Sequence, residues 1–277
     1  MGLLVSLIRW VARTFNFLGS RFLQVSSVLN GFLPVLLSPE ELSALVRTHY
    51  RSIYQEDSVE ERLPYWAPDL TPGEVQLFDR YHVRSGLMLV LGSGSGREAI
   101  ALTHRGVTVI GVDANPVAVR IACHLARLEK ATAYFHLGNF LDLPYVPARF
   151  DFAYQSSSMF SSIAGSAERR AWLRALGRVL RPRGVALLDF YPEPPTLSRL
   201  ARLSRRLNRW LARLPGTNPA YQPGDQWPAG HFLHAFQNED ELRRELTEAG
   251  ARIRELNWVR GLVVVDFPSP ALEETVP

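Results

Sequence analysis

The chain is poor in cysteine, in lysine and in long uncharged apolar runs, and each shortage excludes something. Its 277 residues include one cysteine, Cys123, so that no internal disulfide can form, which is compatible with a reducing compartment. Lys130 is the only lysine among 31 basic residues. We attribute this skew towards arginine to genome composition, and therefore do not interpret the net charge of +4 as a nucleic-acid signature.

A membrane-spanning helix is not expected in residues 1–38, because Arg9, Arg13 and Arg21 interrupt the apolar runs before any reaches 18 residues. The segment has no acidic residue, and its apolar residues recur at helical spacing. This pattern fits an amphipathic helix lying in a membrane surface, and fits equally an N-terminal helix packed on its own core.

Two helix starts define an N-terminal helical region over residues 39–85. Ser38 precedes Pro39 and two glutamates, and Thr71 precedes Pro72 with Glu74 at the capping-box position. The loop between them contains Tyr65 and Trp66, which we expect either to line a lid or to pack beneath these helices.

From residue 86 to the end, apolar strands alternate with helical segments, which predicts one domain with a parallel sheet. The strands are expected at 87–91, 107–112, 132–136, 150–155, 185–190, 252–259 and 262–267. We predict an α/β, Rossmann-like, doubly wound and mainly parallel seven-stranded sheet. The last two strands are expected to form an antiparallel edge hairpin, and helices are expected on both faces.

Residues 193–230 interrupt this alternation and predict a helical lid insert. A helix is expected over 196–214, with leucines on one face and six arginines but no acidic residue. Such a helix suits a membrane surface. The alternative is a solvated lid whose arginines reflect composition. Contact with a membrane is accordingly expected through residues 1–37 and 196–214.

Gly92, Gly94 and Gly96 form a glycine-rich turn that leaves the first strand and opens a helix, where unpaired amide groups favour a ligand. Asp113 ends the next strand, 21 residues after Gly92. An acidic residue there suits the ribose hydroxyls of an adenosine cofactor, although it also suits the N-cap of the following helix. Arg97 replaces the third glycine of a dinucleotide fingerprint, which disfavours a nucleotide-dependent oxidoreductase.

With these motifs the chain resembles the class I S-adenosylmethionine-dependent methyltransferases over roughly residues 80–267. The resemblance also rests on the segments 138–144, 150–154 and 178–185. It implies S-adenosylmethionine as cofactor and an enzyme that methylates a small molecule by in-line displacement at the sulfonium methyl group. The cofactor-binding residues implied by it are Gly92, Ser93, Gly94, Gly96, Asp113, Ala114, Asn139, Phe140 and Gln155.

Substrate contacts are expected from the loops at the carboxyl ends of the strands. The residues proposed for this role are Ser157, Met159, Tyr191 and His231. No catalytic residue is assigned, since an activated methyl group needs positioning more than acid–base help. No cluster has the spacing of metal ligands, so no metal is expected.

One departure from the family pattern leaves a second function open. Val90 stands two residues before the first glycine, where the family usually has an acidic residue that helps to hold the methionine end of the cofactor. A catalytically silent binding or scaffold protein with this fold is therefore the alternative. We expect a cytoplasmic protein, located at the inner face of a membrane if both basic segments bind lipid; oligomeric state and methylated atom stay open.

Overall fold

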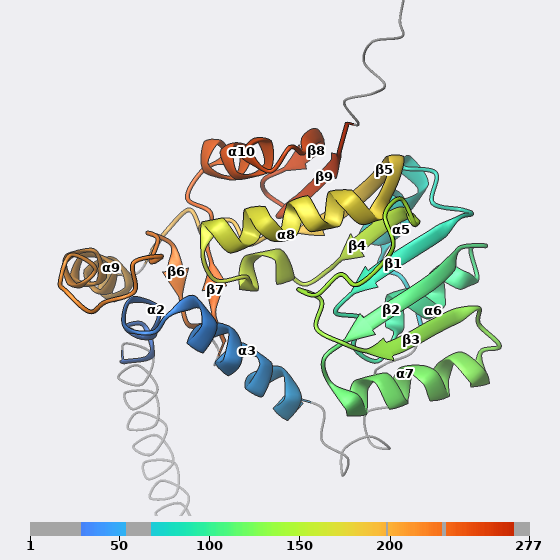
Figure 1. Cartoon of the computed structure of the whole chain (residues 1–277), viewed down its shortest axis with the longest axis horizontal. Coiled ribbons are helices and arrows are strands. Elements are labelled where there is room, and N and C mark those ends of the chain that lie inside the picture. Colours follow the sequence, from blue (N-terminus) through green and yellow to red (C-terminus); the bar gives the residue numbers. More distant parts are fainter. Residues whose placement is uncertain (1–28, 54–67, 198, 229–230, 269–277) are drawn as a thin grey trace, which may run out of the picture.

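The computed structural model in Figure 1 describes residues 29–53, 68–197, 199–228 and 231–268. Its centre is a seven-stranded sheet with the strand order β3-β2-β1-β4-β5-β9-β8. The proposed membrane contact of residues 1–28, and Tyr65 and Trp66, lie outside the described residues.

Five parallel strands and two antiparallel edge strands confirm the predicted fold class. β1 pairs in parallel with β2 and β4, and β5 pairs in antiparallel with β9. The strands are β1 (Leu87–Leu91), β2 (Thr108–Asp113), β3 (Ala133–Leu137), β4 (Phe150–Gln155), β5 (Leu180–Asp189), β8 (Arg252–Asn257) and β9 (Leu262–Asp266).

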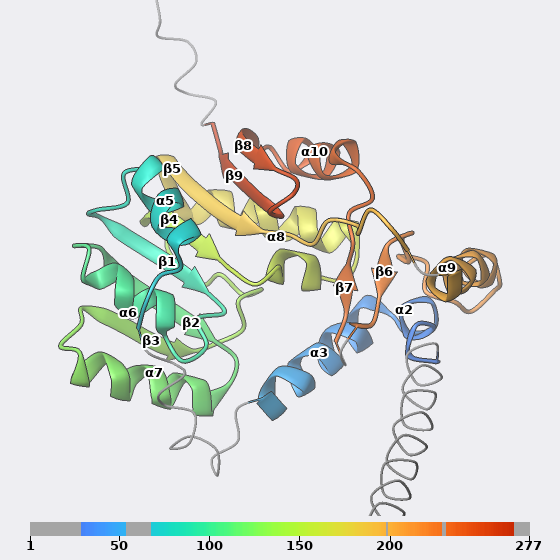
Figure 2. The same cartoon turned by 180° about the vertical axis from the view of Figure 1, so that it is seen from behind.

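Helices cover both faces of this sheet, as Figures 1 and 2 show from opposite sides. α8 (Ser166–Val179) and α10 (Glu239–Glu248) bury Trp172 and Leu246 in the core of one face. α5 (Pro72–Arg80) and α6 (Arg97–Thr103) bury Phe78 and Leu102 in the core of the other. α7 (Pro116–Leu128) packs beside α6. The apolar strand residues are therefore covered on both sides, as a parallel sheet requires.

The strand order places a topological switch point between β1 and β4. The chain continues from β1 to β2 on one side and from β4 to β5 on the other, so the loops that follow β1 and β4 diverge. Open α/β sheets bind ligands in the crevice at this point, outside the carboxyl ends of the strands. The glycine-rich turn follows β1 and therefore lies at this crevice.

The region after β4 differs from the sequence prediction in three ways. A short 3-10 helix spans Met159–Ser162. β5 begins at Leu180 and not at the expected residue 185, because residues 181–184 form an irregular part of the strand. The expected helix of the insert is α9 (Arg199–Leu211). β6 (Asp225–Gln226) and β7 (Leu233–His234) form a small second sheet that was not predicted, because two-residue strands leave no periodic signal.

Two helices precede α5 in the described N-terminal part. α2 (Leu33–Leu36) and α3 (Pro39–Ile53) lie at the edge where the strands of the parallel sheet end (Figure 1). Leu42 and Val46 of α3 pack with Trp227 of the insert and with Phe232, which follows it. In the part of the chain that the structure describes, no helix has both the length and the apolar content to cross a bilayer.

Candidate functional site

The turn after β1 has a backbone that only glycine adopts without strain. Gly92, Gly94 and Gly96 have positive φ angles of 68°, 53° and 87°. A Cβ atom on Gly92 would lie 2.3 Å from the Met159 side chain, and one on Gly96 would lie 2.8 Å from the Phe135 ring. Glycine is therefore required at both positions by the backbone angle and by the side chains packed against the turn.

Asp113 accepts backbone hydrogen bonds from both sides of the crevice. Its Oδ2 accepts from the Gly94 amide at 2.8 Å, and its Oδ1 accepts from the Asn115 amide at 2.8 Å. Burial raises the pKa of the Asp113 carboxyl, against the effect of the backbone hydrogen bonds from Asn115 and Gly94, which lower it. The carboxylate is thus fixed in orientation beside the glycine turn.

Asp113 is not the N-cap of the next helix, which was the structural alternative to ribose binding. Asn115 caps α7, and its Oδ1 accepts from the amides of Val117 at 2.8 Å and Ala118 at 3.2 Å. The capping requirement of α7 is therefore satisfied without Asp113, and the two carboxylate oxygens together keep acceptor capacity for another donor.

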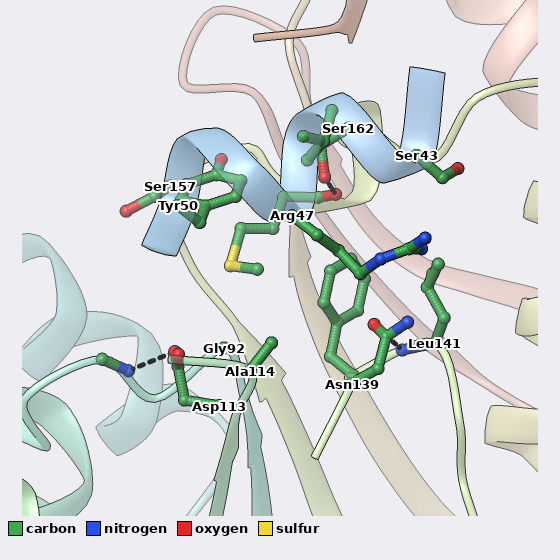
Figure 3. Close-up of a pocket in the computed structure, with 14 residues that line it drawn as sticks. Ser43, Arg47, Tyr50, Gly92, Asp113, Ala114, Asn139, Leu141, Ser157 and Ser162 are labelled. Atoms are coloured by element: carbon green, nitrogen blue, oxygen red, sulfur yellow. Dashed lines mark hydrogen bonds between the residues drawn. The ribbon is translucent and has the colours of Figure 1, made fainter. Parts of the chain in front are cut away.

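A cavity of about 200 Å³ opens at the carboxyl ends of β1, β2 and β4. We call it the cleft. Figure 3 shows its lining, which comes from the strand ends below and from α3 above. Its lining residues are Ser43, Val46, Arg47, Tyr50, Gly92, Gly94, Asp113, Ala114, Asn139, Phe140, Leu141, Ser157, Met159 and Ser162.

α3 covers the cleft, and sequence reasoning missed this role. Tyr50 and Arg47 extend from α3 into the space above Asp113 and Asn139 (Figure 3). The Tyr50 carbonyl accepts from Asn115 Nδ2 at 3.0 Å, which ties the helix to the loop after β2. Burial and the charge of Asp113 raise the pKa of the Tyr50 phenol. The available signal was the spacing of Ser43, Arg47 and Tyr50 along one helical face.

The segment after β3 forms the opposite wall of the cleft. Asn139 Oδ1 accepts from the Leu141 amide at 3.1 Å, which fixes the carboxamide at the cavity. The Phe140 carbonyl accepts from Trp172 Nε1 at 2.9 Å. An adenine ring placed here would contact apolar side chains and a fixed carboxamide. Together with Asp113 and the glycine turn, these residues fit the adenosine part of S-adenosylmethionine.

Several predicted contacts lie next to the cleft and do not line it. Three of them do not reach the cavity surface: Ser93, Gly96 and Gln155. Ser93 and Gln155 are buried, and Gly96 contributes the positive φ angle that shapes the turn. Gln155 is fully buried, and neither carboxamide atom has a hydrogen-bond partner among the described residues. The Tyr191 amide donates to Ser161 Oγ at 2.8 Å.

His231 is likewise absent from the lining but lies close to the helix that covers it. Its ring centroid is 5.8 Å from that of Tyr50 and 5.1 Å from that of His49. His234 is fully buried and pairs through Nδ1 with Asp225 Oδ1 at 2.7 Å, as a packed residue of the small sheet. Of the two histidines, only His231 is near the cleft.

The position of the missing acidic residue is part of the apolar core. Val90 is buried beside Tyr154 and Phe78. Carboxylates nevertheless gather nearby: Glu98 Oε1 accepts from Ser156 Oγ at 3.0 Å and from Arg97 at 2.7 Å.

A second carboxylate completes this group. Glu74 pairs with Arg97 and accepts from the Tyr154 hydroxyl at 3.0 Å. Burial raises the pKa of Glu74, but hydrogen bonds from Arg97 and Thr71 outweigh it and lower the pKa. Arg97 and the two carboxylates thus satisfy one another.

Asp189 at the end of β5 is a further titratable group beside the cleft that the sequence did not indicate. Its Oδ2 accepts from the amide of Ser157 at 3.1 Å, and Ser157 lines the cavity. Burial raises the pKa of Asp189 to about 6, helped by the negative charges of Glu74 and Glu98. The strand pairing brings Asp189 to the cleft, and that pairing cannot be read from the residue itself.

Comparison with known families matches the part of the chain that builds this site. A family model described as a methyltransferase domain matches residues 88–184. The chain is 28% identical over 130 residues to the O-methyltransferase rstn1 of Aspergillus nomiae. This alignment covers 44% of the chain and 56% of that relative, so the chain matches only about half the length of the curated protein.

Solved structures share the architecture over most of the chain. An S-adenosylmethionine-dependent methyltransferase from Methanosarcina mazei is 25% identical with a TM-score of 0.53, covering 73% of the chain and 100% of that protein. A 1,6-didemethyltoxoflavin N1-methyltransferase from Burkholderia thailandensis, solved with its substrate and S-adenosylhomocysteine, is 17% identical. Its TM-score is 0.58, and the match covers 84% of the chain and 92% of that protein. This similarity shows that the two proteins share a fold.

Proposed function

Because the chain belongs to the class I S-adenosylmethionine-dependent methyltransferases, with S-adenosylmethionine as its cofactor, we propose that it methylates a small molecule in the cleft between the sheet and α3. When bound, this cofactor supplies an activated sulfonium methyl group. The protein's task is to hold donor and acceptor in line and to keep water away, and such positioning supplies much of the barrier reduction in bimolecular transfers.

The residues of the cleft divide this task. Asp113 is placed to accept hydrogen bonds from the ribose, and Asn139 and Phe140 bound the adenine site. The backbone of Gly92 and Gly94 faces the methionine part. These contacts fix the donor, and the cover formed by α3 excludes water from it.

Substrate recognition belongs to the end of the cleft that follows β4. Ser157 and Met159 line the cavity there, and Met159 lies over Gly92, where the reacting centre would be. Tyr191 and His231 stand further out. We retain these four residues as the proposed substrate contacts. His231 lies beside Tyr50, as does His49 of α3, and His231 would serve as general base for a hydroxyl substrate.

One observation carries this proposal. The Asp113 carboxylate is oriented by two backbone amides, is spared from helix capping by Asn115, and lines the cavity together with Asn139. A carboxylate kept at the end of the second strand without a capping role favours a ligand with hydroxyl groups.

Calorimetric titration with S-adenosylmethionine and S-adenosylhomocysteine tests the proposal. Saturable binding of both, lost in Asp113→Asn and retained in the surface variant Asp240→Asn, would support it. Binding to neither would favour the alternative of a silent scaffold, to which the buried Val90 gives some weight. Transfer itself is tested by mass spectrometry of small-molecule and lipid extracts incubated with the methyl-labelled cofactor, where a newly labelled product is expected only with active protein.

We propose further that the acceptor is lipophilic and that the chain works at the inner face of a membrane. The cleft supports the first part, since Val46, Phe140, Leu141 and Met159 give it a largely apolar lining. A labelled product confined to the water-soluble fraction of the extract would contradict it.

A further inference from the structure

The helix α9 presents three different faces to its surroundings. One face docks on the body: Asn208 is buried, and its Nδ2 donates to the Gly31 carbonyl at 2.7 Å. Arg205 pairs with Glu193 at the edge of this face. A second face borders a cavity beside the body and a third face is exposed, and Figures 1 and 2 both show α9 at the extreme end of the molecule, remote from the sheet. α9 is therefore anchored along one side only.

The second face is basic and borders a cavity of about 290 Å³. Four arginines line this cavity, together with the Tyr221 ring and the loop at Pro223 and Gly224. Among the described residues, the only carboxylate in this lining is that of Glu193, which already pairs with Arg205. The cavity-lining arginines are Arg202, Arg205, Arg206 and Arg209. Guanidinium groups converging on a cavity favour a phosphate or another oxyanion.

The third face is apolar and exposed, and it adjoins the basic one along the helix. Leu203 is 62% exposed, Leu207 is 42% exposed and Trp210 is 56% exposed. At about 100° per residue these three side chains fall within one narrow stripe. A stripe of exposed leucine and tryptophan beside a row of arginines matches the boundary between lipid headgroups and acyl chains, where tryptophan is enriched.

We propose that α9 docks on an anionic phospholipid bilayer. The α9 surface comprises Arg202, Leu203, Arg206, Leu207, Arg209 and Trp210. Its arginines bind headgroup phosphates, with the adjoining cavity accepting one of them, while Leu203, Leu207 and Trp210 enter the acyl boundary. A helix with arginines and no acidic residue is complementary to an anionic surface. The exposed apolar stripe favours a bilayer over a dissolved anion, because binding a dissolved anion would not bury these side chains. This inference stands independently of the cofactor proposal.

Vesicle flotation with the full chain tests the docking. The protein is expected to float with vesicles of phosphatidylglycerol and phosphatidylcholine in equal parts and to stay in solution with phosphatidylcholine alone. The variant Arg202→Gln/Arg206→Gln/Arg209→Gln should bind roughly 100-fold more weakly, since each basic residue near an anionic surface contributes about fivefold. Its control is Arg127→Gln/Arg149→Gln/Arg174→Gln, which removes three exposed arginines elsewhere and should float like the wild type.

The apolar stripe is tested with its own pair of variants. Leu203→Ser/Leu207→Ser should lose flotation, whereas Leu128→Ser/Leu137→Ser, two exposed leucines on other elements, should keep it. Trp210→Phe should still float, yet lack the blue shift of tryptophan emission that the wild type shows on vesicles. Cofactor affinity should be unchanged in every variant, which separates this test from that of the proposed function.

Three results would overturn the proposal. The first is flotation of the triple-arginine variant and of the double-leucine variant of α9 at wild-type levels, which would assign any lipid binding to another segment. The second is equal flotation with neutral vesicles. The third is saturable binding of inorganic phosphate or RNA by the wild type without flotation, which would make the basic cavity a site for a dissolved anion or a nucleic acid.

Discussion

The cleft and the α9 surface differ in how strongly their side chains are fixed by the rest of the protein. In the cleft, Asp113 and Asn139 are fixed by backbone hydrogen bonds, and Gly92 is closed in by Met159. On the α9 surface, Leu203 and Trp210 are largely exposed and contribute little to the packing of the body. Side chains in the first region serve fold and ligand together, whereas those in the second are free to serve a partner alone. Substitutions should therefore affect stability and binding jointly in the cleft and separately on α9.

Gly92→Ala should have the largest effect. The substitution places a β-carbon at positive φ and 2.3 Å from Met159, and so costs about 2–4 kcal/mol of unfolding free energy. Affinity for S-adenosylhomocysteine should fall roughly 100-fold or more, since the ligand meets this backbone. Chemical denaturation and calorimetry measure both quantities.

Gly216 offers a matched control for that substitution. It also has a positive φ, of 82°, but no atom lies within 4 Å of the place that a β-carbon would occupy. Gly216→Ala should cost about 1–2 kcal/mol of stability through backbone strain alone and leave cofactor affinity intact. Equal losses of affinity in the two variants would remove the distinction between the turn and an ordinary glycine loop.

Asp113→Asn should weaken cofactor binding by about 10–150-fold, because hydrogen bonds to a charged group contribute about 1.5–3 kcal/mol. The asparagine keeps an oxygen for one backbone amide but turns its amide group towards the other, so the unfolding free energy should also fall, by about 1–3 kcal/mol. Titration calorimetry and thermal melts, compared with Asp240→Asn, measure the two effects. An unaltered dissociation constant would contradict the assignment of Asp113 to the ribose.

Tyr50 tests whether α3 is a working cover. Tyr50→Ala should lower cofactor affinity about tenfold by removing a ring from the cleft wall, and Tyr50→Phe should stay within about twofold of the wild type. Leu45→Ala, on an exposed part of the same helix, is the control and should bind normally. A tenfold loss in the control as well would show that the helix as a whole, and not its cleft-facing side, matters.

Asp189 should make stability depend on pH. Its pKa is about 6 in the native state, above the value of about 3.9 for an unfolded aspartate. The native state therefore binds more protons between these values, and stability falls as the pH rises from about 4 to 6. Asp189→Asn removes this loss of stability. The unfolding free energy of the variant should exceed that of the wild type by about 1–3 kcal/mol at pH 7 and differ little from it at about pH 3. Urea titrations at the two pH values provide the measurement.

Substitutions on the α9 surface should have the smallest effect on folding. Leu203→Ser and Trp210→Phe change exposed side chains, and the unfolding free energy should move by less than about 0.5 kcal/mol. Thermal melts without vesicles measure this. A loss above about 2 kcal/mol would mean that the stripe packs against the body, and the contrast between the two regions would fail.

The sheet, and the placing of the glycine turn and Asp113 at its carboxyl edge, could be predicted from the sequence because they depend on local signals. Glycines at positive φ, an acidic residue after the second strand and apolar five-residue runs are each visible within a few positions. Together with the family resemblance, these signals suffice to predict the main features of the sheet. The antiparallel edge at β9 and β8 followed from the two closely spaced strands at the end of the chain.

The cover and the outer wall of the cleft were not predictable in the same way. Tyr50 and Arg47 reach the site through the packing of α3 on Trp227 and Phe232, which lie far later in the chain. Asp189 reaches it through strand pairing, and Gln155 is turned into the interior although its near neighbour Ser157 lines the cavity. Such placements depend on tertiary contacts that no local pattern records.

A crystal structure of the chain with S-adenosylhomocysteine would test the central claim most directly. The account predicts that the ribose hydroxyls lie within hydrogen-bond distance of the Asp113 carboxylate, with the adenine between Asn139 and α3. The account would be contradicted if the ligand were bound elsewhere, or if Met159 and Tyr50 filled the cleft at saturating ligand.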